Sequence, residues 1–272
     1  MTKFYKYQGT GNDFVMADDR SGNFPYKTIE EIAFLCNRRF GIGADGLILL
    51  QEKNGLPYMQ YFNSDGKESS MCGNGGRCFA QFMSDLGLVD GELVFYAIDG
   101  KHTAKMEVDK NTIALQMIDV PELRELASGV FELNTGSPHY VKFQEKLLSE
   151  TDLIAEAKAI RYNKTYAEKG INVNLVNFLG LKELEIRTYE RGVEDETLSC
   201  GTGATAVALA AAKFIGLPDG LNQLKVKVLG GALELKFHYH AQTQSFSNIW
   251  LIGPAQKVFE GQVYWENFLK FI

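Results

Sequence analysis

Cys72-Gly73-Asn74-Gly75-Gly76 and Cys200-Gly201-Thr202-Gly203-Ala204 are two versions of one pattern, a cysteine followed by a glycine-rich stretch. Each leads into a run of good helix formers that ends at a glycine between apolar residues, in Leu86-Gly87-Leu88 and Ile215-Gly216-Leu217. Glycine just beyond a helical run is a typical stop signal. The pattern therefore predicts helices over 77–86 and 204–215, each preceded by a cysteine and glycines.

The flanking sequence repeats in the same order. Strand-like runs follow the two blocks at 93–100 and 224–231, and both end in glycine. Near the start of each half, a strand precedes a glycine-containing loop and a second apolar run, at 4–15 and at 130–141. Four matches in one order, at nearly constant offset, predict an internal duplication.

The helix at 204–215 is apolar almost all round, so protein must surround it on every side. Strand patterns are frequent elsewhere, at 93–96, 112–117, 184–189, 225–229, 233–239 and 248–252. Two further helices are predicted, over 28–37 and 147–156. We expect an α/β fold of the α+β type, with two pseudo-symmetric halves and an active site in the cleft between them. Each half is a strongly curved, mostly antiparallel sheet around a central helix. The halves are predicted at 1–118 and 119–255, with 256–272 packing back on the first.

Composition limits the class of protein. The 272 residues are 45% hydrophobic and 12% aromatic, which excludes a wholly disordered chain, and the net charge is −6. An acidic balance argues against a nucleic-acid partner. The apolar stretch 204–217 is too short to span a membrane, and Lys213 interrupts it. With four cysteines and no signal peptide, we expect a cytoplasmic protein with reduced thiols.

The two equivalent cysteines, Cys72 and Cys200, suggest the chemistry. The first backbone N–H groups of a helix have no partner within the helix, and they favour negative charge. A thiol placed there is expected to ionise more readily, and an anion such as a carboxylate can bind beside it. If the halves face each other, one thiolate and one thiol meet a substrate from opposite sides. That arrangement suits a racemase or epimerase, in which one group removes a proton and the other donates one.

Other interpretations of these residues stay open. Cys36 and Cys78 are predicted to be small buried hydrophobic residues. A zinc site needs closely spaced ligands that Cys72 and Cys78 do not provide, and His238 with His240 better fits a solvated strand face. A cysteine hydrolase using His139, or a binding module without catalysis, is the alternative from another class. Loss of activity on removal of either cysteine, rather than of one only, separates an epimerase from a hydrolase.

The chain resembles the diaminopimelate epimerases, which are amino-acid epimerases independent of pyridoxal phosphate. The resemblance runs from about residue 6 to about residue 253 and rests on four motifs in order. They are Gly9-Thr10-Gly11-Asn12-Asp13-Phe14, Gly41-Ile42-Gly43-Ala44-Asp45-Gly46, Asn63-Ser64-Asp65-Gly66 leading to Met71-Cys72-Gly73-Asn74-Gly75, and Tyr189-Glu190-Arg191-Gly192 leading to Cys200-Gly201-Thr202-Gly203. It implies conversion of LL-2,6-diaminopimelate into the meso isomer, for lysine and peptidoglycan precursor synthesis, by a homodimer without cofactor or metal.

The resemblance also implies roles for individual residues. Cys72 and Cys200 are the proton-transfer pair, with Cys72 the base toward the LL isomer. The backbones of Gly73, Asn74, Gly201 and Thr202 hold the carboxylate at the reacting carbon. The distal amino-acid end is fixed by Asn12, Asn63, Asn172, Glu190 and Arg191. A carboxylate next to a guanidinium suits an ammonium and a carboxylate on the substrate, although neighbours on a strand can also point to opposite faces.

Three departures from the family pattern concern substrate contacts. Ser137 stands before Pro138-His139 where asparagine is common, Gly46 replaces a frequent glutamine, and the 191–200 loop is one residue longer. Ser137, His139 and Gly46 are therefore further candidate contacts. The rival within the isomerases is an enzyme of the same fold acting on proline, hydroxyproline or another small acid. Such a substrate has no distal ammonium and carboxylate for Glu190 and Arg191 to bind.

Overall fold

A computed structural model describes residues 1–107 and 112–268 of the chain. It divides into two compact units, one formed by Met1–Leu115 with Pro254–Ile272 and the other by Gln116–Gly253. The last four residues of the predicted C-terminal segment, 269–272, lie outside the described residues. In the part of the chain that is described, no helix is both long and apolar enough to cross a bilayer.

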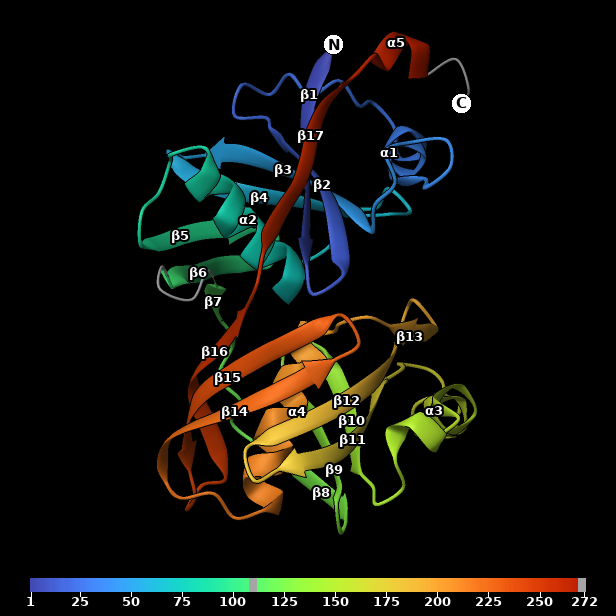
Figure 1. The fold of residues 1–272 in the computed structure, drawn as a ribbon, viewed down its shortest axis with the longest axis vertical. Coiled ribbons are helices and arrows are strands. Elements are labelled where there is room, and N and C mark those ends of the chain that lie inside the picture. The colour runs from blue at the N-terminus through green and yellow to red at the C-terminus, as the bar shows by residue number, and fades with distance from the viewer. Residues whose placement is uncertain (108–111, 269–272) are drawn as a thin grey trace. The chain divides into compact units, whose positions relative to one another are not determined.

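The first unit is an eight-stranded mixed sheet with two longer helices and a short C-terminal one (Figure 1). Its strands follow the spatial order β17-β1-β2-β3-β4-β5-β6-β7, in which β2–β3 and β4–β5 are parallel and the other pairs antiparallel. The elements are β1 (Thr2–Gly9), β2 (Asn12–Asp18), α1 (Ile29–Cys36), β3 (Gly46–Lys53), β4 (Leu56–Asn63), α2 (Gly73–Asp85), β5 (Glu92–Ala97), β6 (Gly100–Glu107), β7 (Thr112–Gln116), β17 (Gln256–Val263) and α5 (Trp265–Phe268).

The second unit repeats this arrangement. Its spatial order is β8-β9-β10-β11-β12-β14-β15-β16, with β10–β11 and β12–β14 parallel and the other neighbours antiparallel. The elements are β8 (Arg124–Ala127), β9 (Val130–Asn134), β10 (Pro138–Phe143), η2 (Leu148–Glu150), α3 (Leu153–Arg161), β11 (Asn172–Gly180), β12 (Glu183–Glu190), β13 (Asp195–Thr197), α4 (Gly201–Phe214), β14 (Gly220–Val228), β15 (Gly231–His240) and β16 (Ser245–Gly253). The short β13 pairs with the end of β12.

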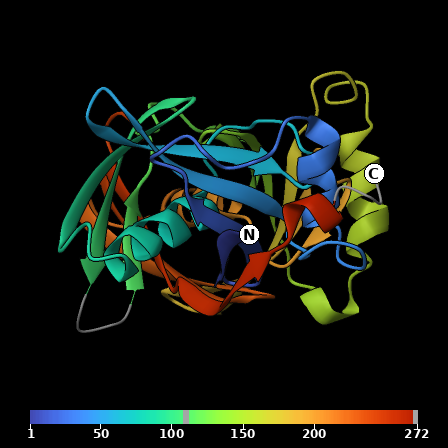
Figure 2. The ribbon, with the colours of Figure 1, turned by 90° about the horizontal axis from the view of Figure 1, so that it is seen from above.

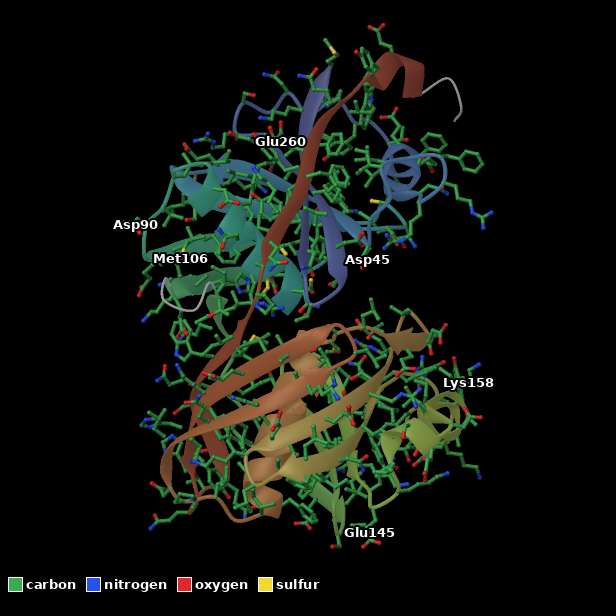
Figure 3. The ribbon with its side chains drawn as sticks, in the orientation of Figure 1. Asp45, Asp90, Met106, Glu145, Lys158 and Glu260 are labelled. Atoms are coloured by element: carbon green, nitrogen blue, oxygen red, sulfur yellow. The ribbon has the colours of Figure 1, made fainter. Side chains whose placement is uncertain are left out.

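The two units therefore share one topology, and the predicted duplication and fold class are confirmed. β1 corresponds to β9, β2 to β10, α1 to α3, β3 to β11, β4 to β12, α2 to α4, and β5 to β14. The first strand of the second unit, β8, corresponds to β17 of the first unit. β17 comes from the end of the chain. Figure 3 shows Glu260 on β17, where its carboxylate pairs with Lys3 of β1 at 3.3 Å.

Helices cover both faces of the central strands in the first unit. Val15 and Ala17 of β2 face the core that α1 completes, as do Leu47 and Leu49 of β3. Alternate residues of the same strands point to the opposite face, where α2 contacts β1, β2 and β3. In Figures 1 and 2, α1 and α2 lie to either side of these strands. Burial on both faces explains why the two strands are continuously apolar rather than alternating.

The second unit encloses its central helix. α4 contacts β9, β10, β11, β12, β14, β15 and β16, so the sheet curves round it. Residues 203–212 of α4 are all buried, as the apolar sequence predicted. The opposite face of the sheet is covered by α3, which packs Leu153 and Ala157 against Val173 and Leu175.

The position of one predicted helix was wrong. The segment predicted as a helix over 147–156 contains the short turn η2 and only the first turn of α3. α3 begins after Asp152, whose carboxylate accepts a hydrogen bond from the Ala155 N–H at 3.1 Å. An aspartate at this position accepts a hydrogen bond from one of the first N–H groups of the helix, which have no partner within the helix. The helix therefore starts after Asp152, and it ends at Arg161.

Candidate active site

Cys72 and Cys200 are the N-caps of α2 and α4. The Sγ atom of Cys72 accepts a hydrogen bond from the Gly75 N–H at 3.1 Å, and that of Cys200 accepts one from the Gly203 N–H at 3.4 Å. A side-chain acceptor at this position normally comes from serine, threonine, asparagine or aspartate. A sulfur that replaces them in both units is held where the free N–H groups and the helix dipole favour a thiolate.

Glycine at the third helical position lets the backbone approach the sulfur closely. A Cβ atom at Gly203 would lie 2.7 Å from Asn174 Oδ1 and 3.3 Å from the Cys200 sulfur. A Cβ atom at Gly75 would lie 3.0 Å from the Cys72 sulfur. A side chain at Gly203 would therefore displace Asn174, whereas one at Gly75 would crowd the Cys72 sulfur.

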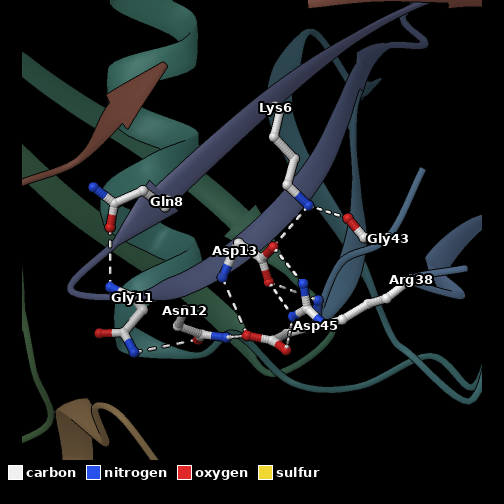
Figure 4. Close-up of polar contacts among 9 residues, drawn as sticks. Lys6, Gln8, Gly11, Asn12, Asp13, Arg38, Gly43 and Asp45 are labelled. Carbon is white, nitrogen blue, oxygen red and sulfur yellow. Dashed lines mark hydrogen bonds and ion pairs between the residues drawn. The ribbon is translucent and has the colours of Figure 1, made fainter. Parts of the chain in front are cut away.

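The Cys72 end is organised by Asn12, at the start of β2. Its Oδ1 atom accepts hydrogen bonds from Asn74 Nδ2 at 3.2 Å and from the Cys72 thiol at 4.0 Å. Its Nδ2 atom donates to Asp45 Oδ2 at 2.6 Å (Figure 4). Because a carboxylate can only accept, Asp45 fixes the orientation of this amide and turns the Asn12 oxygen toward Cys72 and Asn74.

Asp45 belongs to an ion cluster that also contains Lys6, Asp13 and Arg38 (Figure 4). Arg38 bridges the two carboxylates at 2.7 Å from each, and Lys6 binds Asp13 at 2.8 Å and also donates to the Gly43 carbonyl. Burial on its own raises the pKa of Asp13, but the hydrogen bonds from Arg38 and Lys6 hold it well below its usual range. The cluster thus ties β1 and β2 to the loop that carries Asp45.

Replacing Asp45 with Asn is expected to lower kcat/KM about tenfold, because a hydrogen bond to a charged group is worth roughly 1.5–3 kcal/mol. The new amide can donate as well as accept, so Asn12 is free to turn its Nδ2 group toward Cys72. Steady-state kinetics and the melting temperature of the variant check this. Asp65→Asn is the control and is expected to keep full activity, since the exposed Asp65 carboxylate contacts the ammonium and the backbone N–H of Lys67. Unchanged kcat/KM in folded Asp45→Asn would show that Asp45 does not act through Asn12.

The Cys200 end contains a buried polar network. The His139 Nε2 atom lies 3.0 Å from Thr202 Oγ1, which in turn lies 3.4 Å from the Cys200 sulfur. Asn174 Nδ2 lies 3.1 Å from His139 Nδ1, and Asn174 Oδ1 accepts from Thr188 Oγ1 at 2.9 Å. Burial, helped by the charge of Arg191, lowers the pKa of His139 to about 3. The imidazole is therefore neutral at physiological pH and serves as a fixed hydrogen-bonding group.

Ser137, Asn172 and Arg191 meet beside this network. Asn172 Nδ2 donates to Ser137 Oγ at 2.8 Å, and Asn172 Oδ1 accepts from the Arg191 backbone N–H at 2.9 Å. The Arg191 guanidinium donates to the Lys169 carbonyl at 3.0 Å and approaches Ser137 Oγ at 3.5 Å, and its side chain is otherwise exposed. The serine that departs from the family pattern thus takes part in the contacts around Asn172 and Arg191.

The remaining predicted residues lie at strand ends. Asn63 closes β4 and pairs in register with Gly46, the first residue of β3. A Cβ atom at Gly46 would lie 2.4 Å from the Phe62 carbonyl oxygen, so this chain has no room for a side chain there. Glu190 ends β12 and pairs in register with Asp195 of β13.

The acidic stretch of the longer loop is bound within the second unit. The Glu194 carboxylate pairs with Arg161 at 2.9 Å and accepts from the Tyr162 hydroxyl at 2.9 Å. Glu196 receives two hydrogen bonds from Arg187 at 2.6 Å each. The additional loop residues are therefore anchored to α3 and β12 by charge pairs.

The candidate residues predicted from the sequence do not include Asp45 and Asn174, which belong to the two networks, or Arg77, which donates to Asn74 Oδ1 at 2.9 Å. Asn172 and Asn174 alternate with the apolar residues Val173 and Leu175 at the start of β11, and this alternation is a signal for two polar side chains on one face of the strand. Cys36 and Cys78 are buried as predicted, and burial raises the pKa of each to about 12. These two thiols stay protonated at neutral pH.

Comparison with known proteins gives consistent results. A model of the family described as diaminopimelate epimerase matches residues 4–122 and 131–258. A diaminopimelate epimerase of Flavobacterium psychrophilum is 49% identical, with 95% of this chain and 98% of the relative covered. One from Chlorobaculum tepidum is 38% identical, with 94% and 98% covered.

Two solved structures share the fold at low identity. A phenazine biosynthesis protein of the PhzF family from Bacillus anthracis superposes with a TM-score of 0.74 at 15% identity, covering 96% of this chain and 98% of that one. A hydroxyproline epimerase from Agrobacterium vitis, solved with trans-4-hydroxy-L-proline, gives 0.66 at 13% identity, covering 96% and 92%.

Proposed function

The chain belongs to the diaminopimelate epimerase family, and from this premise we propose that it converts LL-2,6-diaminopimelate into the meso isomer. It is an isomerase of the epimerase class, and the resemblance noted in its motifs is confirmed by the family match. The reaction serves the synthesis of lysine and of peptidoglycan precursors. The observation that carries the proposal is the pair of equivalent helices, each capped by a cysteine sulfur that accepts a backbone N–H.

In the proposed mechanism, the two thiols exchange roles during each turnover. The Cys72 thiolate takes the α-proton of the LL isomer, and the C–H electron pair stays on the α-carbon as a carbanion. The Cys200 thiol donates its proton to the opposite face of that carbon. The products are the meso isomer, a Cys72 thiol and a Cys200 thiolate, so charge and protons balance. The reverse reaction begins from that second state.

The helix ends are suited to stabilise the intermediate. Backbone N–H groups of Gly73, Asn74, Gly201 and Thr202 lie in the first turns of α2 and α4, where anions bind favourably. In our proposal they hold the carboxylate on the reacting carbon, into which the carbanion charge delocalises. Donors that are already in place stabilise a developing charge more effectively than water, which must reorganise.

The distal end of the substrate requires both an anion and a cation. We propose that Glu190 binds the distal ammonium and that Arg191 binds the distal carboxylate, with Asn12, Asn63 and Asn172 completing the contacts. The position of Arg191 supports this role: its backbone is held by Asn172 and its guanidinium lies beside Ser137. A planar guanidinium is well suited to bidentate recognition of a carboxylate.

Substrate choice is tested by incubating the reduced protein with LL-diaminopimelate, L-proline or trans-4-hydroxy-L-proline and resolving the isomers by chromatography. We expect meso-diaminopimelate only, with no isomerisation of the two ring compounds. Turnover of a ring compound alone would replace the proposal with a proline-type epimerase, while keeping the fold. The reaction is proposed to need neither pyridoxal phosphate nor metal, so added chelator and carbonyl reagent should leave the rate unchanged.

The family resemblance also leads us to propose a homodimer located in the cytoplasm. Sedimentation of the reduced protein tests the assembly, with a dimer mass expected. A monomer mass together with full activity would overturn that part of the proposal without affecting the chemistry.

A further inference from the structure

The two capped helices differ at one equivalent position. Arg77 in α2 and Thr205 in α4 both follow their cysteine by five residues, and both donate to the carbonyl of the first helical residue. Arg77 Nη1 lies 3.2 Å from the Gly73 oxygen, and Thr205 Oγ1 lies 2.9 Å from the Gly201 oxygen. The duplication has thus kept the hydrogen bond but placed a cation in one unit and a neutral hydroxyl in the other.

Arg77 is completely buried, with 0% of its surface exposed. Its Nη2 atom donates to Asn74 Oδ1 at 2.9 Å and to Thr10 Oγ1 at 3.3 Å, and both acceptors are neutral. Its Nε atom has no hydrogen-bond partner. Within 1–107 and 112–268, no carboxylate pairs with this guanidinium. Burying an unpaired charge is costly, so a chain that keeps one needs an anion close by.

The neighbouring charged groups already have partners of their own. Burial lowers the pKa of Arg77 to about 10, so it remains a cation at neutral pH, and the thiols of Cys78 and Cys72 are the groups that act on it by charge. Cys78 stays neutral because burial raises its pKa to about 12. Charged groups on or beside the strands packed against α2 form separate pairs: Lys6 and Arg38 with Asp13 and Asp45, His102 with Asp99, Lys3 and Lys257 with Glu260, Arg20 with Asp18, and Lys105 with Glu92. On α2 itself, Asp85 accepts from the Tyr7 hydroxyl.

Arg77 is connected directly to the residues around Cys72. It holds Asn74 Oδ1, so the Asn74 Nδ2 group is left to donate to Asn12 Oδ1, which lies 4.0 Å from the Cys72 sulfur and accepts from it only when Cys72 is protonated. One side chain therefore orients the amide beside the sulfur and supplies positive charge behind the first turn of α2.

The surroundings of Cys200 carry no comparable buried cation in the described residues. Its partner Thr202 is neutral, and Thr202 is bound by His139, which burial keeps neutral. The charge that acts on His139 is that of Arg191, which directly follows β12 and is exposed and screened by solvent.

We propose that Arg77 is a positioning residue that stabilises negative charge at the Cys72 end, so that in the substrate-free protein Cys72 is the thiolate and Cys200 the thiol. This inference rests on the proposed function and extends it, because it states which cysteine carries the negative charge before substrate binds. The resting state accepts the LL isomer directly, and the meso isomer requires the protons to redistribute first.

The test is the pH dependence of alkylation in the full-length, reduced protein. Iodoacetamide is added between pH 5 and pH 9, and peptide mass spectrometry follows Cys72 and Cys200 separately, with buried Cys36 and Cys78 as unreactive references. We expect the alkylation midpoint of Cys72 to lie at least about one pH unit below that of Cys200, which is a tenfold difference in ionisation. The midpoint, rather than the rate, is compared because Cys200 is only 7% exposed.

Two variants separate the charge from the packing. Arg77→Lys keeps the cation and should keep the low alkylation midpoint of Cys72. Arg77→Gln keeps hydrogen-bonding groups but not the charge, so it should raise the Cys72 midpoint by about one pH unit and leave the Cys200 midpoint unchanged. The melting temperature checks that each variant folds. A Cys72 midpoint that is unchanged in folded Arg77→Gln, or equal shifts at both cysteines, would overturn the proposal. Should neither variant fold, a wild-type Cys72 midpoint at or above that of Cys200 would still overturn it.

The experiment uses no substrate, so its outcome is independent of the epimerase assay. Wild-type turnover of LL-diaminopimelate with equal midpoints would reject the role of Arg77 and leave the proposed function intact. Unequal midpoints without any turnover would reject the function and leave the charge asymmetry in place.

Discussion

Replacing either Cys72 or Cys200 with alanine is expected to lower kcat for epimerisation by at least about 10³-fold, because in the proposed mechanism each thiol is an acid or base and such groups contribute roughly 10²–10⁴-fold. The two losses should be similar in size, since each variant lacks one half of the same proton transfer. Stereoisomer chromatography at saturating substrate measures them. The double variant should be little worse than either single one, as is usual for groups that act as a unit.

Cys36→Ala is the matched control for these variants. Cys36 is buried in the core formed by α1, β2 and β3, and its thiol stays protonated. We expect full activity and a small loss of stability from the cavity. A cysteine hydrolase would depend on one thiol only, so high activity in either Cys72→Ala or Cys200→Ala would contradict the two-thiol account.

Asp13→Asn is expected to destabilise the first unit by about 3 kcal/mol, the lower end of the range for breaking a buried ion pair. The side chains of Lys6 and Asp13 are only 8% and 17% exposed. In the variant the buried Lys6 ammonium loses this negative charge and is left beside neutral acceptors, the Gly43 carbonyl and the new amide oxygen. Asp18→Asn is the control, because the Asp18 pair with Arg20 is more exposed and should contribute no more than about 1 kcal/mol.

The two tryptophans allow each unit to be followed by fluorescence. Trp265 is part of the core of the first unit, and Trp250 lies on β16 of the second. In a Trp250→Phe background, urea unfolding therefore reports on the unit that contains Asp13. A midpoint that does not move in Asp13→Asn would show that the ion cluster does not stabilise this unit.

The ion pair between Lys6 and Asp13 also predicts that the stability of the first unit depends on pH. Because the folded-state pKa of Asp13 is held below its unfolded value near 4, the pair contributes fully above about pH 4 and is lost as the pH falls further. The unfolding free energy of the first unit should thus decline below about pH 4, less steeply in Asp13→Asn than in wild type. Parallel curves would mean that other carboxylates cause the decline.

Apolar periodicity and glycine stop signals were sufficient to predict that the two central helices exist and that the chain contains two similar units. Gly87 and Gly216 predicted the ends of α2 and α4 closely, and repetition gave the two-unit fold. The predicted starts at 77 and 204 were wrong, because the glycines after each cysteine lie inside the helices, which begin at Gly73 and Gly201. The position of α3 was missed because the capping role of Asp152 competes with the apolar residues before it. No local signal shows that β17 pairs with β1, since that contact joins opposite ends of the chain.

In the candidate site, too, some residues could be predicted from the sequence and others are apparent only in the folded structure. Equivalent positions in the repeat identified Cys72 and Cys200, and the family motifs supplied the other candidates. The orienting contacts of Asp45, Arg77 and Asn174 could not be predicted, because each depends on strands brought together by the sheet. Arg77 in particular looks like an ordinary helix residue in the sequence, and only its complete burial reveals an unpaired charge.

The most direct test of the central claim is proton NMR of the reduced protein with LL-diaminopimelate in deuterium oxide, without pyridoxal phosphate. Two thiols on opposite faces predict that early meso product carries deuterium at one α-carbon, while the remaining LL substrate keeps its protons. The α-proton signal should fall at the rate at which the meso isomer forms. Meso product that retains the original proton, or no isomerisation by folded and reduced protein, would contradict the two-thiol mechanism.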